Sequence, residues 1–302
     1  MNRIITIVGP TATGKSALAI QLALALGGEI VSADSRQVYK YMDIGTAKPS
    51  HEDRAAIPHH LIDIINPDEN FTLATYQELA FEAIADIQRR GKIALLVGGS
   101  GLYVRAVTGG LSIPKVAPDP ELRRRLEKRA EQEGYQVLYS ELLKADPIAA
   151  EKIDPRNVRR VIRALEVCIT AGVPFSQLKR SSPEVPALTI GLTTTVREDL
   201  YKRIDSRVDD MIERGLVDEV KWLIDRGYLP ELPAMSGLGY KQIVAHLKGE
   251  TSLKETIQHI KYETHRFARH QYAWFRFKDE RIHWFDIREE PLESIRSLIV
   301  IS

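Results

Sequence analysis

Residues 9–16 read Gly-Pro-Thr-Ala-Thr-Gly-Lys-Ser and complete the pattern G-x-x-x-x-G-K-S/T, a loop that cradles phosphate groups. An apolar run at residues 4–8 leads into this loop, and a helix-forming run at residues 16–26 follows it. In such a unit, successive backbone N–H groups point at one spot beside the positive end of the helix dipole. The Lys15 ammonium adds a point charge for phosphate, and the Ser16 hydroxyl suits a magnesium ion. A chance match is expected in about one chain of this length per hundred, so we predict a strand, a phosphate-binding loop and a helix here.

The composition is that of an ordinary globular protein, with 302 residues, 44% hydrophobic and 27% charged. This length allows one large domain with an insertion, or two domains. The net charge of +1 gives no general attraction to nucleic acid, so any basic surface must be local. Cys168 is the only cysteine, which excludes a disulfide framework and a cysteine-rich zinc finger, and its apolar neighbours predict a buried, inert thiol. We find no apolar stretch of membrane-spanning length and no targeting signal, so we expect a cytoplasmic protein without a membrane partner.

The first hundred residues alternate apolar strand patterns with helical patterns. The predicted strands are residues 4–8, 30–33, 61–65 and 93–97, and later ones are 188–193 and 283–287. Strands separated by helices of this length predict a parallel sheet that is covered on both faces. Ligands of such sheets collect outside the carboxyl ends of the strands. We therefore expect the reactive groups just after each strand.

The character of the chain changes after Gly109-Gly110. Residues 111–186 contain many prolines around helical patterns, which predicts a helical insertion between core segments 1–110 and 187–302. If Arg156, Arg159, Arg160 and Arg163 all lie on one helix, their spacing puts them on one face. Such a face either binds phosphate or is simply solvated. A second basic cluster, at residues 123–129, is partly neutralised by glutamates, which favours solvation.

Polar groups follow the second and fourth predicted strands. Asp34 either caps a turn or acts as a general base or magnesium partner, while Arg36 and Gln37 offer donors that could read a planar ligand. Residues 98–101 read Gly-Gly-Ser-Gly where many ATPases with this loop have an acid, which disfavours a motor or switch ATPase. Glycines let a ligand approach the backbone and Ser100 adds one polar contact, although a plain glycine-rich turn is the alternative.

Basic and aromatic residues interleave at residues 261–276, within a predicted helix. Stacking surfaces beside cations suit unpaired RNA, although the aromatic residues could instead belong to the core. We expect a mixture, with Arg266, Arg269 and His270 facing a partner. The side chains of the adjacent histidines His59 and His60 would point to opposite faces of a strand, which disfavours a two-histidine metal site.

Taken together, these segments resemble the tRNA dimethylallyltransferases of bacterial type, also called tRNA isopentenyltransferases. A phosphate loop suits many families, but five further motifs in this order suit one: residues 34–39 with 42–49, 59–63, 98–103, 157–166 and 239–242. The resemblance spans about residues 4–285. It implies an α/β fold with a P-loop NTPase-like parallel sheet, helices on both faces, and a mainly helical insertion domain at residues 111–186 that binds tRNA.

The resemblance implies transfer of a dimethylallyl group from dimethylallyl diphosphate to N6 of the adenosine 3′-adjacent to the tRNA anticodon. By this resemblance Asp34 accepts the N6 proton, Ser100 helps to hold the adenine, and Lys15 and Arg207 assist at the diphosphate. The implied diphosphate and Mg²⁺ loop comprises Gly9, Pro10, Thr11, Ala12, Thr13, Gly14, Lys15 and Ser16, with Ser16 on the metal. The implied contacts to the anticodon stem-loop of tRNA are Asp34, Ser35, Arg36, Gln37, Ser100, Arg123, Arg156, Asn157, Val158, Arg159, Arg160, Gly237, Leu238, Gly239, Tyr240, Lys241, Gln242 and Arg269. We expect a monomer.

Two departures from the family pattern stand out. Ser100 replaces a more usual threonine, which keeps the hydroxyl but loses a methyl contact in the pocket. Residues 269–271 read Arg-His-Gln where two permanent cations more often precede the glutamine. No cysteine–histidine finger follows, so the longer eukaryotic type is not supported.

Two other classes of protein share some of these features. A P-loop small-molecule kinase has the same loop and can use an acid after the second strand, but it does not require the basic insertion or the basic–aromatic helix. An RNA-binding protein switched by nucleotide would also fit the loop and the basic helix. The absence of an acid after the fourth strand counts against that switch.

Overall fold

The computed structural model describes residues 3–111, 113–114, 116–178 and 184–301. The chain divides into two compact units, one formed by Met1–Gly109 with Glu184–Ser302 and the other by Gly110–Pro183. The sequence predicts these boundaries after residues 110 and 186. No helix among the described residues is long and apolar enough to span a membrane.

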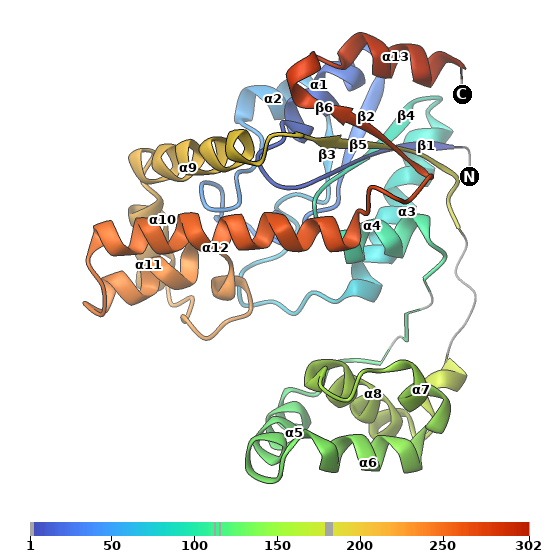
Figure 1. Ribbon diagram of the computed structural model, residues 1–302, viewed down its shortest axis with the longest axis vertical. Helices are drawn as coiled ribbons and strands as arrows, with labels where there is room; N and C mark the ends of the chain where they lie inside the picture. Colours follow the sequence, from blue (N-terminus) through green and yellow to red (C-terminus); the bar gives the residue numbers. More distant parts are fainter. Residues whose placement is uncertain (1–2, 112, 115, 179–183, 302) are drawn as a thin grey trace. The chain divides into compact units, whose positions relative to one another are not determined.

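The larger unit is built on a sheet (Figure 1). In the part of the chain that the structure describes, this sheet has six strands, and every strand pair is parallel. The strand order is β3-β2-β4-β1-β5-β6. The strands are β1 Ile4–Val8, β2 Gly28–Ser32, β3 His59–His60, β4 Ile93–Val97, β5 Ala187–Thr193 and β6 Ile282–Asp286. The predicted α/β fold with a parallel sheet is confirmed.

Helices cover both faces of this sheet, because successive strand residues point to opposite sides. In β1, Ile4 and Val8 pack with α3 (Leu73–Arg89) and α4 (Gly101–Thr108). Ile5 and Ile7 pack on the other face with α1 (Lys15–Leu26) and α13 (Leu292–Ile301). The remaining helices of this unit are α2 His51–Ala56, α9 Arg197–Glu213, α10 Leu216–Asp225, α11 Tyr240–Leu247 and α12 Leu253–Trp274, with short 3₁₀ turns at Ala234–Ser236 and Ile287–Glu289.

Five predicted strands are confirmed to within two residues, but the strand predicted at residues 61–65 is wrong. The third strand is His59–His60. Leu61 and Asp63 have left-handed φ angles of 64° and 57°, which interrupt the extended chain. The following N–H groups donate to the carbonyl oxygens of Gln37 and Val38 instead of to a neighbouring strand.

The smaller unit is helical, as predicted for the insertion. It contains α5 Pro120–Glu133, α6 Tyr135–Ala145, α7 Pro147–Lys152, α8 Val158–Ala171 and a 3₁₀ turn at Phe175–Leu178, packed around an apolar core. Cys168 is half-buried rather than buried, and burial raises the pKa of its thiol.

The predicted four-arginine helix face is wrong. Helix α8 begins only at Val158, because the side chain of Asn157 caps it by accepting the N–H of Arg160. Arg156 therefore lies before the helix. Arg163 turns instead toward the fully buried carboxylate of Glu166, at 2.6 Å.

Candidate active site

The ends of β1, β2 and β4 bring three polar segments to one edge of the sheet, because these strands are parallel neighbours. The phosphate loop follows β1, Asp34 follows β2, and Ser100 follows β4. A Cβ on Gly98 would lie 2.1 Å from the Ala33 carbonyl oxygen, so the segments after β2 and β4 touch only because position 98 is glycine. The predicted meeting of these groups is therefore observed.

The phosphate loop is open to an anion. Gly9 has φ 137°, and a Cβ there would lie 2.2 Å from the carbonyl oxygen of Leu192, so the tight turn requires glycine. A hydrogen bond within the loop holds its shape, since the Thr13 hydroxyl donates to the Pro10 carbonyl at 2.9 Å. Helix α1 begins after Gly14 with no side-chain cap and no acidic residue in its first turn. Its first N–H groups and the positive end of its dipole are thus free for a phosphate.

Two cations that are far apart in the sequence lie side by side at this loop, Lys15 of the loop itself and Arg207. The Lys15 ammonium donates to the Pro10 carbonyl at 2.7 Å, and the Arg207 guanidinium from α9 donates to the Thr11 hydroxyl at 3.4 Å. Burial, followed by the charge of Arg207, lowers the pKa of Lys15 to about 7, while Asp34 acts in the opposite direction. Burial also lowers the pKa of Arg207, again against the effect of Asp34. An anion bound here would favour the charged form of both side chains and raise their pKa values.

A cavity of about 410 Å³, which we call the loop cavity, opens beside the phosphate loop. Lys15, Ser16, Arg207 and Arg214 line it, together with residues 47–50. The Arg214 guanidinium has no carboxylate partner among the described residues, and its charge acts on Arg207. The sequence gives no signal for Arg214, which is there one more charge at the end of an amphipathic helix.

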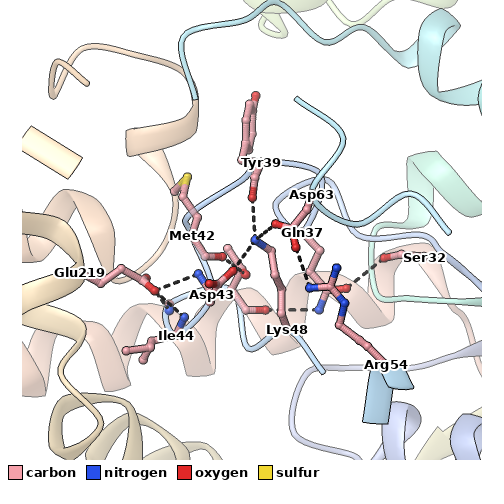
Figure 2. Close-up of polar contacts among 12 residues, drawn as sticks. Ser32, Gln37, Tyr39, Met42, Asp43, Ile44, Lys48, Arg54, Asp63 and Glu219 are labelled. Atoms are coloured by element: carbon pink, nitrogen blue, oxygen red, sulfur yellow. Dashed lines mark hydrogen bonds and ion pairs between the residues drawn. The ribbon is translucent and has the colours of Figure 1, made fainter. Parts of the chain in front are cut away.

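Lys48 also lines the loop cavity, but its charge is used within the protein. Its ammonium donates to the carboxylates of Asp43 and Asp63, at 2.7 and 2.5 Å, and to the Tyr39 carbonyl at 2.7 Å (Figure 2). Arg54 adds a second cation to Asp63, at 2.6 Å. Two cations therefore balance two carboxylates, and Lys48 has no charge to spare for a ligand.

A second cavity of about 620 Å³, which we call the Asp34 cavity, contains the groups that follow β2 and β4. Asp34, Ser100 and Arg207 line it, so Arg207 belongs to both cavities. Much of the remaining lining is apolar or aromatic: Tyr103, Ile204, Val208, Met211, Ile260, Phe267 and Trp274. The cavity combines a carboxylate and a hydroxyl with space for flat or apolar groups.

Asp34 caps the turn after β2, which is one of the roles considered from the sequence, and it has a second carboxylate oxygen that the turn does not use. Its Oδ1 accepts the N–H of Arg36 at 2.8 Å, which holds the turn. Its Oδ2 has no hydrogen-bond partner among the described residues. The Ser100 hydroxyl accepts the N–H of Ser35 at 3.1 Å, and the Ser100 N–H donates to the Ala33 carbonyl. One carboxylate oxygen is thus fixed and the other remains available to a ligand.

Arg36 and Gln37 are occupied by the protein itself. The Arg36 guanidinium donates to the Pro233 carbonyl at 2.6 Å and to the Ser236 hydroxyl at 3.3 Å, although its side chain still lines the Asp34 cavity. The Gln37 amide accepts from Ser32 and donates to the carbonyls of residues 46 and 47 (Figure 2). Gln37 therefore shapes the loop around the site and has no free amide group for reading a ligand.

Sequence reasoning missed the role of Gln271. This buried side chain on α12 accepts the N–H of Thr11 at 2.8 Å and donates to the Gly99 carbonyl at 3.0 Å. It thereby links the phosphate loop to the turn before Ser100. A Cβ on Gly99 would lie 2.2 Å from the Gln271 nitrogen, which explains a glycine at this position.

The other residues predicted to contact RNA fall into two groups. In the larger unit, residues 237–240 line the Asp34 cavity, Lys241 is exposed, Gln242 is buried and caps Gly239, and Arg269 donates to the Tyr201 hydroxyl. In the helical unit, Arg123 pairs with the buried Glu166, and Arg156 with Asp154. Arg159 and Arg160 are exposed and have no carboxylate partner among the described residues.

Known proteins resemble this chain over nearly its whole length. The family model of the IPP transferases matches residues 37–278. A tRNA dimethylallyltransferase of Thermomicrobium roseum is 50% identical over 287 residues, which are 95% of this chain and 87% of the relative. A tRNA dimethylallyltransferase of Roseiflexus castenholzii is 52% identical over 91% of this chain and 90% of its own.

Solved structures agree with this similarity. The full-length tRNA isopentenylpyrophosphate transferase of Bacillus halodurans is 41% identical, with a TM-score of 0.72, over 99% of this chain and 96% of its own. A eukaryotic dimethylallyltransferase acting on tRNA is 30% identical, with a TM-score of 0.80, over 95% of this chain and 74% of its own. The predicted resemblance is confirmed, and the chain belongs to the tRNA dimethylallyltransferase family of IPP transferases.

Proposed function

We propose that this protein transfers the dimethylallyl group of dimethylallyl diphosphate to N6 of the adenosine 3′-adjacent to the anticodon in tRNA. The observation that carries the proposal is the position of Asp34. Asp34 lines a cavity that can take a base and has one carboxylate oxygen without a partner among the described residues, while its charge acts on both Lys15 and Arg207 at the phosphate loop. A base for the acceptor and a cradle for the leaving group are therefore neighbours.

The phosphate loop stabilises the leaving group in this proposal. The bond between the prenyl carbon and the diphosphate oxygen breaks, and the electron pair stays on the diphosphate. The N–H groups of the loop, with Lys15 and Arg207, bind the negative charge that builds up there. Preorganised donors of this kind often lower a barrier by several kcal/mol. The mainly apolar lining of the Asp34 cavity suits the prenyl chain.

Asp34 acts on the acceptor. Adenine N6 is a weak nucleophile because its lone pair is shared with the ring, and a carboxylate is too weak a base to deprotonate the neutral amine. As the N6–carbon bond forms, the amine becomes acidic and Asp34 accepts its proton. General base catalysis of this kind contributes roughly 10²- to 10⁴-fold in rate. Ser100 steadies the segment that carries Asp34 through the N–H of Ser35.

The residues of the loop cavity fit a magnesium ion. The Ser16 hydroxyl is exposed there and has no hydrogen-bond partner among the described residues. In the described part of the chain, no three His, Cys, Asp or Glu side chains gather around one point. Since Mg²⁺ is commonly held by one or two protein oxygens with substrate phosphates and water, we propose Ser16 and the diphosphate as its ligands. When bound, Mg²⁺ neutralises part of the charge of the leaving group.

The deciding experiment is a mass measurement on nucleosides. Bulk tRNA is incubated with the protein, Mg²⁺ and dimethylallyl diphosphate, then digested, and the expected product is adenosine that carries an added C5H8. A parallel incubation with ATP and a panel of small metabolites tests the kinase alternative. Transfer of labelled phosphate without prenylated adenosine would overturn the proposal.

For the RNA contact, we propose the exposed pair Arg159 and Arg160. Reversing both charges to glutamate is expected to weaken tRNA binding and to flatten its dependence on salt, because fewer counterions are released from the RNA. The measurement is the dissociation constant at several salt concentrations. Arg124 and Arg125, which are equally exposed on α5, provide the matched double reversal. Equal salt slopes for wild type and the Arg159/Arg160 variant would mean that this pair is only solvated.

We expect the reaction to take place in the cytoplasm, where its tRNA substrate is. We also propose that one copy of the chain suffices. Every group that the mechanism uses comes from a single chain.

A further inference from the structure

One carboxylate from α10 joins two walls of the Asp34 cavity. Glu219 Oε2 accepts the N–H groups of Asp43 and Ile44, at 2.9 and 2.7 Å (Figure 2). Its Oε1 accepts the N–H of Gly45 at 3.2 Å and the hydroxyl of Tyr240 at 2.6 Å. Each oxygen therefore receives two donors.

Successive backbone N–H groups that point at one spot form an anion-binding nest. Here the anion is supplied by the chain itself, so the segment around Gly45 is held by a charged group and not by a regular ladder of backbone hydrogen bonds. Hydrogen bonds to an ionised acceptor are roughly twice as strong as neutral ones. Glu219 thus holds the three N–H groups of residues 43–45, while backbone bonds from residues 47 and 48 to the carbonyls of Ile44 and Asp43 close the turn that follows.

The two segments joined by Glu219 face the ligand space. Gly45 and Thr46 line one part of the Asp34 cavity, and residues 237–240 line another. The ring of Tyr240 lies directly on Gly45, because a Cβ at that position would be 2.5 Å from a ring carbon. Glu219 therefore sets where both segments stand relative to each other.

The same loop reaches the loop cavity through residues 47–50, but other groups hold that part. Lys48 is bonded to Asp43, but it is also anchored by Asp63 and the Tyr39 carbonyl, and the Gln37 amide donates to the carbonyls of residues 46 and 47. A change at Glu219 should therefore disturb the Asp34 cavity much more than the diphosphate cradle.

We propose that Glu219 is a positioning residue, which acts through Gly45 and Tyr240 to hold the target adenine against Asp34. This inference rests on the proposed function, since it assigns the Asp34 cavity to the base. It predicts a defect in the chemical step with RNA and no defect in diphosphate binding.

Glu219→Gln is the most selective variant. An amide has only one accepting oxygen. If this oxygen faces Asp43 and Ile44, it keeps the hydrogen bonds from their two N–H groups. The amide nitrogen then faces Gly45, whose N–H loses its acceptor. Since a 1 Å misplacement can cost 10²-fold, we expect the single-turnover rate with saturating anticodon stem-loop RNA to fall about 10- to 100-fold.

Three measurements separate this role from a general loss of structure. The affinity for pyrophosphate with Mg²⁺, measured by calorimetry, should stay within about twofold of wild type while the rate falls. Asp218→Asn, which removes an exposed neighbouring charge from the same helix, is the matched control and should leave both values unchanged. Gly45→Ala should reproduce the rate defect with Glu219 intact, because the added methyl group displaces the Tyr240 ring.

A smaller side chain gives an independent test. In Glu219→Ala the nest is empty, so added formate should restore part of the single-turnover rate, whereas chloride at the same ionic strength should not. Wild-type activity and pyrophosphate binding are measured first, because their absence would refute the proposed function and not this inference. An unchanged rate in Glu219→Gln, or an equal loss of pyrophosphate affinity, would overturn the role of Glu219.

Discussion

Asp34→Asn is expected to bind tRNA and pyrophosphate nearly as well as wild type and to lose roughly 10²- to 10⁴-fold in single-turnover rate. The asparagine oxygen can still accept the N–H of Arg36, so the turn after β2 keeps its shape. What disappears is the second carboxylate oxygen, which has no protein partner among the described residues. The prenylated product is quantified by mass after mixing excess enzyme with anticodon stem-loop RNA and dimethylallyl diphosphate.

Comparison with Asp34→Ala separates the two roles of this side chain. Alanine removes both the hydrogen bond to Arg36 and the base, whereas asparagine removes only the base. If Asp34 only capped the turn, asparagine would keep near-normal turnover and alanine alone would be slow. Similar, large losses of rate in both variants, with intact pyrophosphate binding, are expected from a general base.

The parts of the site that could be predicted from sequence are those that depend on local order. The phosphate loop is contiguous, and its flanking strand and helix have clear apolar patterns. The proximity of Asp34 and Ser100 could be predicted, because each follows a strand and the carboxyl ends of parallel strands share an edge. The rule needs no knowledge of side-chain contacts.

The parts that could not be predicted depend on contacts between distant segments. Gln271 reaches Gly99, 172 residues away, while nearby Arg269 on the same helix faces solvent, so the basic–aromatic pattern does not tell which side chain points inward. Arg36 is occupied by a carbonyl 197 residues away. The error at residues 61–65 has a similar origin, since two left-handed residues fold the apolar run back onto the carbonyls of Gln37 and Val38 in the preceding loop.

Lys15 is expected to take up a proton when the diphosphate binds. In the free protein its pKa is lowered to about 7, first by burial and then by Arg207, so at pH 8 most molecules carry a neutral amine. A bound diphosphate favours the ammonium form and raises this pKa, so binding at pH 8 should be accompanied by uptake of about one proton. At pH 6 the amine is already charged and the uptake should vanish. Calorimetry in buffers of different ionisation enthalpy measures this number directly.

Lys15→Met isolates the proton taken up by Lys15, because the protons exchanged by pyrophosphate and Mg²⁺ are the same with the wild type and with the variant. The variant should lose the additional proton uptake at pH 8 and, by removal of one preorganised donor at the leaving group, about 10²- to 10³-fold in turnover. Lys221→Met, which neutralises an exposed lysine on α10, should change neither quantity. Equal proton uptake in wild type and Lys15→Met would show that Lys15 is already charged in the free protein. The leaving group would then gain its stabilisation from a cradle that is fully charged before the substrate arrives, and the turnover loss in Lys15→Met would still follow from removal of that charge.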